Sequence, residues 1–409
     1  MHISKSVIVA AATAAPGLAH YTKECKVNTY FGQAPLPVGE TDRLSTYCKS
    51  DSIDHVTLAF VNNSPENGMG YPGTNFGAHC YATVFQKSTR KGQVPTKLLT
   101  ECNDMKEDIK VCQDLGKKVY LSIGGEVTAT SNYAISSVDA GIQFGQQMYD
   151  IFGPKHKGYN GPRPFGDLSV DGFDFDIETK FKDQKPYIAM IDKLRCLIRD
   201  NKCGMTLTAS PQCPLDAQNF QMDSIMAKAQ FDKIFIQFYN NPSCAATSKT
   251  GFNLDKWVDY IKDKPSKDAE LYIGLPGSSK AAQSGYISPD KVTELICKHK
   301  YGKNFGGVSI WDAYFARKNE DCEKETYYDV VKKALKCGGC KNDVCPPKPK
   351  TTSTSSAAVT SPTSTSSSAA VTIATSASDA VTASSSATES APTDGPATIT
   401  ASASVTDAA

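Results

Sequence analysis

Eight short runs of β-branched and aromatic residues constrain the fold of this chain more than any other feature. They cover residues 27–32, 53–61, 118–123, 172–178, 205–210, 233–239, 271–275 and 307–311, and each has the length and composition of a β-strand. The stretches between them are long enough to hold helices. Strands that alternate with helices predict an α/β fold with a parallel sheet.

Helical patterns lie between these runs. Over residues 98–112, after Pro95 and before Gly116, apolar side chains recur at spacings of three and four and predict an amphipathic helix. Pro186 opens a second pattern that continues to Ile198. Eight strand and helix units in roughly 320 residues favour a closed (β/α)8 barrel, the TIM barrel. A doubly wound open sheet is the alternative, but no glycine-rich phosphate loop follows the first strand.

Length and charge narrow the classes of partner. With 409 residues, 40% of them hydrophobic, the chain can bury the core of a large single barrel. A formal net charge of +1 gives no electrostatic footprint for nucleic acid or an anionic membrane. We expect a neutral partner, no cofactor, no nucleic acid or membrane binding, and a monomer.

The first 19 residues have the organisation of a secretory signal peptide. Lys5 precedes an apolar stretch over residues 7–15, and small residues end the segment at Ala19. The stretch is too short to span a bilayer, and no later segment is apolar over the required length. We expect a secreted, extracellular product that begins at residue 20.

The composition changes abruptly at residue 346, after the expected globular domain (20–345). Of the 59 residues from 351 to 409, 30 are Ser or Thr, and none is Lys, Arg or aromatic. Such a segment has too few bulky apolar side chains to offset the entropy of ordering. We expect 346–409 to be a disordered, O-glycosylated tail that can associate with a cell wall, with an unmodified flexible tail as the alternative.

Fourteen cysteines follow the expected signal peptide, and this even number makes disulfide bonds the default expectation in an oxidising compartment. Cys337, Cys340 and Cys345 form a close cluster, but no fourth ligand follows at a spacing suited to zinc. We expect no metal site.

One strand-like run carries three carboxylates. Asp174, Asp176 and Glu178 occupy alternate positions of the run 172–178, and apolar residues fill the positions between them. Residues two apart on a strand face the same side, so the acids should point into the barrel and the apolar side chains toward the helices. Because the C-terminal strand ends form the active site of such barrels, Glu178 should lie nearest the mouth.

Three acids about 6 to 7 Å apart along one face repel one another, and a barrel selected for stability alone would hold Val, Ile or Leu there. Pairing of each acid with a buried Lys or Arg is one alternative. A calcium or magnesium site is another. The arrangement favours a functional site.

The residues around these acids resemble a known family. The run DGFDFDIE (171–178) matches the DGxDxDxE signature of family 18 glycoside hydrolases. LSIGG (121–125), ASPQCP (209–214), IQFYNNP (236–242) and GGVSIW (306–311) resemble other strand ends of this family, in the same order. Over about residues 25–337 the chain is similar to the hevamine-like class III chitinases. The resemblance implies an endochitinase acting on chitin or N-acetylglucosamine oligomers.

The resemblance also implies a retaining, substrate-assisted mechanism. Glu178 would protonate the glycosidic oxygen while the acetamido oxygen of the sugar at subsite −1 attacks the anomeric carbon, giving an oxazolinium ion that water opens. Asp176 would orient the acetamido N–H and share a proton with Asp174. Burial and neighbouring negative charge should raise the pKa of Glu178. Tyr239 would donate its hydroxyl to the acetamido carbonyl.

Further positions match family residues that contact sugars. By this resemblance Trp311 would form the apolar floor beneath the sugar, although Trp311 and Tyr239 could instead be aromatic core residues. Asn62 also begins an N-glycosylation sequon, but a residue that faces the barrel could not carry a glycan. The other matched positions are Gln237, Tyr30, Gln33 and Gly125.

Glu126 departs from the family pattern, in which a small residue often follows the Gly-Gly pair, and an acid there could alter the subsites beside the cleavage point. Only about 30 residues separate Pro276 from Gly307, which leaves no room for an extra domain and favours an open groove with endo cleavage.

Two cysteine pairings are implied by related proteins, Cys213 with Cys244 and Cys48 with Cys112, and the other ten cysteines cannot be paired from sequence.

Two other functions remain open: a non-catalytic lectin or inhibitor on the same fold, and an endo-β-N-acetylglucosaminidase acting on N-glycans. Lectin-like relatives typically lose the last acid of the signature, so the presence of Glu178 favours an enzyme.

Overall fold

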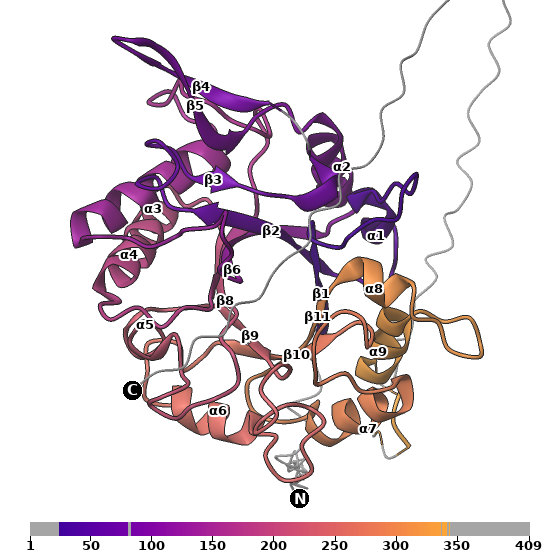
Figure 1. Cartoon of the computed structure of the whole chain (residues 1–409). Helices are drawn as coiled ribbons and strands as arrows, with labels where there is room; N and C mark the ends of the chain where they lie inside the picture. The colour runs from indigo at the N-terminus through magenta and orange to yellow at the C-terminus, as the bar shows by residue number, and fades with distance from the viewer. Residues whose placement is uncertain (1–23, 81–82, 337, 342, 344–409) are drawn as a thin grey trace, which may run out of the picture. The chain divides into compact units, whose positions relative to one another are not determined.

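Eight parallel strands close into a barrel in the computed structural model, which describes residues 24–80, 83–336, 338–341 and 343 (Figure 1). The strands are β1 (Lys26–Phe31), β2 (His55–Asn63), β6 (Lys118–Gly125), β7 (Gly172–Ile177), β8 (Thr206–Ala209), β9 (Lys233–Gln237), β10 (Glu270–Pro276) and β11 (Phe305–Trp311). Each pairs with the next in this order, and β1 pairs with both β2 and β11, which closes the ring. The predicted closed barrel is confirmed and the open doubly wound sheet is wrong.

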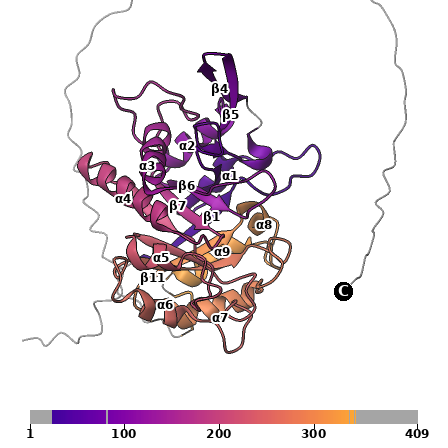
Figure 2. The ribbon, with the colours of Figure 1, turned by 60° about the vertical axis from the view of Figure 1, so that its left-hand side comes forward.

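Helices surround this barrel in both views (Figures 1 and 2). They are α1 (Leu44–Cys48), α2 (Asn103–Asp114), α3 (Val138–Phe152), α4 (Lys185–Asp200), α5 (Asp223–Lys228), α6 (Leu254–Ile261), α7 (Pro289–His299), α8 (Ala313–Arg317) and α9 (Tyr327–Leu335). The helix opened by Pro186 is α4, with Pro186 in its first turn, and its side chains Ile191, Leu194 and Ile198 are buried as predicted. No helix in the described part of the chain has the length and apolar character needed to cross a membrane.

The connection between β2 and α2 differs from the prediction. Helix α2 begins at Asn103 rather than before Leu98, which belongs with Pro95 to strand β5 (Gly92–Leu99). Thr96 and Leu98 are buried while Pro95 and Lys97 are exposed, so this segment follows the period of a strand, and the helical spacing was misleading. Strand β5 pairs with β4 (Val84–Thr89) in a hairpin that projects from the barrel (Figure 2), and the short β3 (Gly73–Thr74) extends the sheet at β2.

Two layers of side chains form the core. Apolar residues on the outer face of the barrel, such as Phe173 and Phe175 of β7, pack with the helices in one large cluster. A smaller cluster fills the inside of the barrel and contains Tyr30, Tyr120 and Tyr272, with Trp311 packed against it. Large side chains of this kind make the barrel a packed core rather than a pore.

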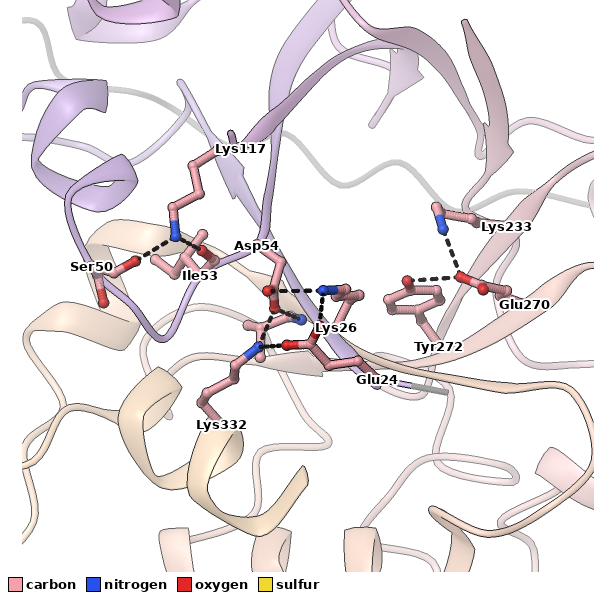
Figure 3. A network of polar contacts seen from close by, with 11 residues as sticks. Glu24, Lys26, Ser50, Ile53, Asp54, Lys117, Lys233, Glu270, Tyr272 and Lys332 are labelled. Carbon is pink, nitrogen blue, oxygen red and sulfur yellow. Dashed lines mark hydrogen bonds and ion pairs between the residues drawn. The ribbon is translucent and has the colours of Figure 1, made fainter. Parts of the chain in front are cut away.

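The N-terminal ends of the strands are held by ion pairs (Figure 3). The ammonium of Lys332 on α9 lies 2.7 Å from Asp54, which precedes β2, and only 5% of the Lys332 side chain is exposed. Asp54 also accepts the backbone N–H of Val27 over 2.8 Å. Elsewhere on this face Lys233 pairs with Glu270 over 2.6 Å. In barrels of this type such contacts at the N-terminal face serve stability.

Replacing Asp54 with alanine should lower the free energy of unfolding by about 3 kcal/mol, because the buried Lys332 ammonium then keeps only the more distant carboxylate of the exposed Glu24, 3.9 Å away. Urea denaturation measures the change. The matched control is Asp114→Ala, which removes the exposed Lys110–Asp114 pair of α2 and should cost less than about 0.5 kcal/mol. Equal losses in the two variants would contradict a special role for the buried pair.

Disulfide bonds cross-link helices and loops around the barrel. Cys48–Cys112 and Cys213–Cys244 are present, which confirms both predicted pairings. Two further bridges, Cys80–Cys102 and Cys297–Cys340, could not be assigned from the sequence. The expected signal peptide (1–19), the expected tail (346–409), and the cysteines 337 and 345 lie outside the described residues.

Candidate active site

Asp174 lies deepest in the row of acids and is fully buried. The strand register places Ser122 of β6 and Thr208 of β8 beside it, and their hydroxyls donate to its carboxylate over 2.7 and 2.6 Å. Tyr30 and Ser210 add hydroxyl donors at 3.0 and 2.9 Å. Burial raises the pKa of Asp174, and these hydrogen bonds oppose the rise. Among the described residues, hydroxyl groups rather than lysine or arginine hold this acid.

Asp176 lies one step nearer the mouth of the barrel and is also buried. The amide of Gln237, at the end of β9, donates to Asp176 Oδ1 over 2.8 Å and to the backbone oxygen of Ser210 over 3.0 Å. Burial, together with the charges of Glu178 and Asp174, raises the pKa of Asp176 well above the ordinary range. This carboxyl group therefore holds a proton far more readily than a free aspartate.

Glu178 follows the last residue of β7 and is only partly buried, unlike the other two acids. Its backbone N–H donates to the hydroxyl of Tyr133 over 3.3 Å, and that hydroxyl donates to the carbonyl oxygen of Gly125 over 2.8 Å. Burial raises the pKa of Glu178, and the charge of Glu126 adds to the rise. A raised pKa keeps a proton available for general acid catalysis.

Aromatic side chains surround the acids at the strand ends. Trp311, the last residue of β11, stacks on Phe60, with ring centroids 5.8 Å apart and planes 23° apart, and its centroid lies 5.5 Å from that of Tyr30. Tyr239 lies two residues beyond β9 and is 8% exposed. Burial and the nearby carboxylates raise its pKa well above the ordinary range, so its hydroxyl stays protonated and can donate.

The Gly-Gly pair at the end of β6 allows the backbone to approach the acids. Gly124 has a φ of +120°, and a Cβ there would lie 1.9 Å from the carbonyl oxygen of Asp176. Gly125 has a φ of +85°, and a Cβ there would lie 2.9 Å from the ring of Phe60. Larger residues at either position would move β7 or the aromatic wall.

A cleft of about 460 Å³ opens at the C-terminal ends of the strands, lined among others by Asp176, Glu178, Gln237, Tyr239 and Trp311. This volume is in the range of small-molecule sites. Among the described residues, no group of three His, Cys, Asp or Glu side chains is arranged to hold a metal ion.

Three other residues predicted to contact sugars divide between the cleft and the layer beneath it. Gln33 and Asn62 line the cleft. The Gln33 amide donates to the carbonyl oxygen of Ala59 over 2.8 Å, and Asn62 Oδ1 accepts the amide of Asn63 over 2.9 Å. Tyr30 lies deeper, where its hydroxyl contacts Asp174 and Ser210.

Sequence reasoning missed several residues that position the site. Ser122 and Thr208 stand at inward positions of their strands, so polar residues there were a usable signal. Phe60 and Tyr133 gave no such signal, because only the folded chain brings their rings to the cleft wall and to Glu178.

Fold and site together define a class of protein: a (β/α)8 barrel whose row of inward-facing carboxylates ends at a cleft on the C-terminal face. Residues 29–293 match the glycosyl hydrolases family 18. The chain belongs to this family.

Individual relatives agree with this assignment. The chain is 37% identical over 368 residues to Endochitinase A1 of Aspergillus fumigatus, covering 87% of this chain but 42% of the relative. It is also similar to the solved structure of the ICChI chitinase from Ipomoea carnea, with 26% identity, a TM-score of 0.58, and coverage of 76% of this chain and 99% of that one. A tamarind chitinase-like lectin shares the fold, with 21% identity, a TM-score of 0.52, and coverage of 75% of this chain and 99% of the lectin. The chain thus spans less than half the length of the curated relative.

Proposed function

We propose that this protein is an endochitinase that hydrolyses internal β-1,4 bonds between N-acetylglucosamine units of chitin with retention of configuration. The observation that carries the proposal is the position of Glu178 in the cleft, beyond the buried Asp176, with the pKa of both acids raised by burial. Similarity to fungal proteins named endochitinases supports the same substrate.

In the proposed reaction Glu178 gives its proton to the glycosidic oxygen as the bond to the anomeric carbon breaks. The carbonyl oxygen of the acetamido group on the same sugar forms the new bond to that carbon, and the product is an oxazolinium ion. Glu178 then takes a proton from the water that opens this ion. The new reducing end has the same configuration as the bond that was cut.

The inner acids act on the acetamido group. Asp176 accepts its N–H and stabilises the positive charge of the ion, while Asp174, held by four hydroxyl groups, supports the charge and proton balance of Asp176. The Tyr239 hydroxyl donates to the acetamido carbonyl and fixes its angle of attack. We assign no cofactor to this reaction.

The remaining predicted residues bind the sugar. Trp311, supported by Phe60, offers an apolar face on which the sugar ring packs. Gln237, Gln33 and Asn62 provide polar contacts from the cleft walls. Gly125 leaves space beside the Phe60 ring, and Tyr30 acts from beneath through Asp174.

We further propose the organisation expected from the sequence: a signal peptide at 1–19, a catalytic domain at 20–345, and a glycosylated tail at 346–409. The four disulfide bonds of the described residues support passage through an oxidising compartment. The enzyme would then act outside the cell as a monomer, with no nucleic acid or membrane partner.

Digestion of N-acetylglucosamine hexamers tests the proposed function. We expect cleavage of internal bonds, and we expect each new reducing end to form first as the β-anomer. NMR spectra recorded early in the reaction identify the anomer. Products that begin as the α-anomer would contradict the mechanism. Release of whole N-glycans from a glycoprotein, without chitin fragments, would favour the endo-β-N-acetylglucosaminidase. Binding of the hexamer without hydrolysis would favour a lectin or inhibitor.

A further inference from the structure

We propose that Asn240 is a positioning residue for substrate binding, because its side chain holds residues 281–284 in place as one wall of the cleft. This inference rests on the proposed function and adds to it a residue that controls how tightly the cleft binds an oligosaccharide. Asn240 acts through this wall and takes no part in breaking the glycosidic bond.

The wall belongs to the connection between β10 and α7, residues 277–288, which contains neither helix nor strand. From this connection Ala281, Ala282 and Gln283 line the cleft that also contains Glu178. None of these three side chains can donate or accept a proton in catalysis. They can contribute apolar and polar contacts to a bound sugar, so the wall affects binding rather than proton transfer.

The two ends of this connection are anchored independently of Asn240. The backbone N–H of Gly277 donates to the carbonyl oxygen of Trp311 over 2.7 Å. The amide of Asn319 donates to the carbonyl oxygen of Gly277 over 2.8 Å and to the hydroxyl of Tyr286 over 3.0 Å. Residues 278–284 form the span between these anchors, and the cleft wall lies within it.

Asn240 supports this span. Its side-chain oxygen accepts the backbone N–H groups of Gln283 over 3.0 Å and of Ser284 over 3.2 Å. Its own backbone N–H donates to the carbonyl oxygen of Ser284 over 3.2 Å. The next residue, Gly285, lies so close to Tyr239 that a Cβ on it would lie 2.6 Å from the Tyr239 Cα. The wall is therefore fixed against the two residues that follow Phe238.

The backbone conformation of Asn240 offers a second reason for an asparagine at this position. Its φ is +56°, in the left-handed region that glycine adopts most readily and that asparagine and aspartate tolerate. If the backbone alone matters, glycine can replace asparagine. If the side-chain oxygen matters, aspartate can replace it and glycine cannot. The two explanations predict opposite rankings of these variants.

The test measures kcat and KM on the N-acetylglucosamine hexamer for the wild-type enzyme, Asn240→Gly and Asn240→Asp. Asn240→Gly should raise KM about fivefold and leave kcat within about twofold, because the wall then adopts its binding conformation only part of the time while the acids are unchanged. Asn240→Asp keeps an oxygen that accepts both N–H groups, so its KM should stay within about twofold of the wild-type value.

Hydrogen exchange provides a measurement that does not depend on activity. The backbone N–H groups of Gln283 and Ser284 donate to the Asn240 side chain. A peptide that covers residues 278–288 should therefore exchange faster in Asn240→Gly than in the wild-type protein or Asn240→Asp, as followed by mass spectrometry. Bound hexamer should slow this exchange in the glycine variant, because it selects the ordered wall.

Asn304→Gly is the matched control. Asn304 also has a positive φ, +62°, and its amide donates to the carbonyl oxygens of Lys267 over 3.0 Å and Ala269 over 2.9 Å. It precedes β11, at the end of the barrel opposite the cleft. Asn304→Gly should thus lose a comparable loop contact and keep the wild-type kcat and KM.

The outcomes separate this inference from the proposed function. If Asn240→Gly cuts the hexamer with the wild-type KM, the wall does not depend on Asn240, and the inference is wrong while the proposed function stands. If Asn240→Asp raises KM as much as Asn240→Gly, support through the accepting oxygen is also wrong. If the wild-type protein does not cut the hexamer, the proposed function fails, and hexamer affinities of the same variants, measured by calorimetry, decide the inference.

Discussion

Replacement of Glu178 with glutamine should lower kcat on N-acetylglucosamine oligomers by about a thousandfold or more. The amide keeps the size of the side chain, but it has no acidic proton for the glycosidic oxygen, and a positioned general acid contributes about 10²- to 10⁴-fold. Tyr239 cannot replace it, because the pKa of its hydroxyl is raised well above the ordinary range and the group does not give up its proton readily. Initial rates with the acetylated hexamer measure the loss.

Two further measurements accompany this variant. Glu178→Gln should still bind the oligomer, because Asp176, Tyr239 and Trp311 remain in the cleft, and calorimetry checks that affinity. In the wild-type enzyme kcat/KM should fall as pH rises through the raised pKa of Glu178, since only the protonated group donates. That alkaline fall should be absent from the residual activity of the variant. A variant with near wild-type rates would remove Glu178 from the reaction.

Replacement of Asp176 with asparagine should lower kcat by about 10²- to 10³-fold, the cost of losing one preorganised electrostatic contact to the transition state. Asparagine has no negative charge to stabilise the oxazolinium ion. Its NH₂ group can also face the Gln237 NH₂ group, which in the wild-type protein donates to Asp176 over 2.8 Å, and two donors cannot form that hydrogen bond. The acetamido group would then lose both its orientation and its counter-charge. Rates on the same hexamer, with KM measured separately, check the prediction.

Asp171→Asn is the matched control for this second variant. Asp171 also belongs to the acidic signature, but it precedes β7 at the opposite end of the strand and pairs with Lys118 over 2.9 Å. We expect Asp171→Asn to reduce stability and to leave kcat near the wild-type value. If Asp176→Asn retained the wild-type kcat, the acetamido group would not depend on Asp176, and substrate assistance by this route would be excluded.

The polar interior of the barrel shows why these acids can stay buried. Burying the Asp174 carboxyl group in an apolar core would cost free energy, but hydroxyl groups from three strands of the barrel donate hydrogen bonds to it. The amide of Gln237 donates to Asp176 in the same way. Raised pKa values further reduce the cost, because a protonated acid carries no charge. Repulsion within the row is thus relieved without a cation from the protein.

Much of this site could be predicted because it depends on local periodicity. The alternation of acids with apolar residues in 172–178 decides which of its side chains face the inside of the barrel, whatever surrounds the strand. The eight strands were recognisable for the same reason, and their observed ends differ from the expected ones by no more than two residues. Prediction failed at residues 98–102, where the apolar spacing fits a helix, because Leu98 belongs to a hairpin strand and is buried on the same face as Thr96.

The sequence by itself determined the barrel and the order of its acids, since both follow from the two-residue repeat of a strand and the alternation of strands with helices. Only the tertiary structure decided which groups meet those acids. Ser122 and Thr208 reach Asp174 through the register of neighbouring strands, Tyr133 reaches Glu178 from a distant loop, and Glu126 enters the cleft without a cation partner in the described chain. Such contacts join residues far apart along the chain, so they depend on the packing of the whole barrel rather than on any local pattern.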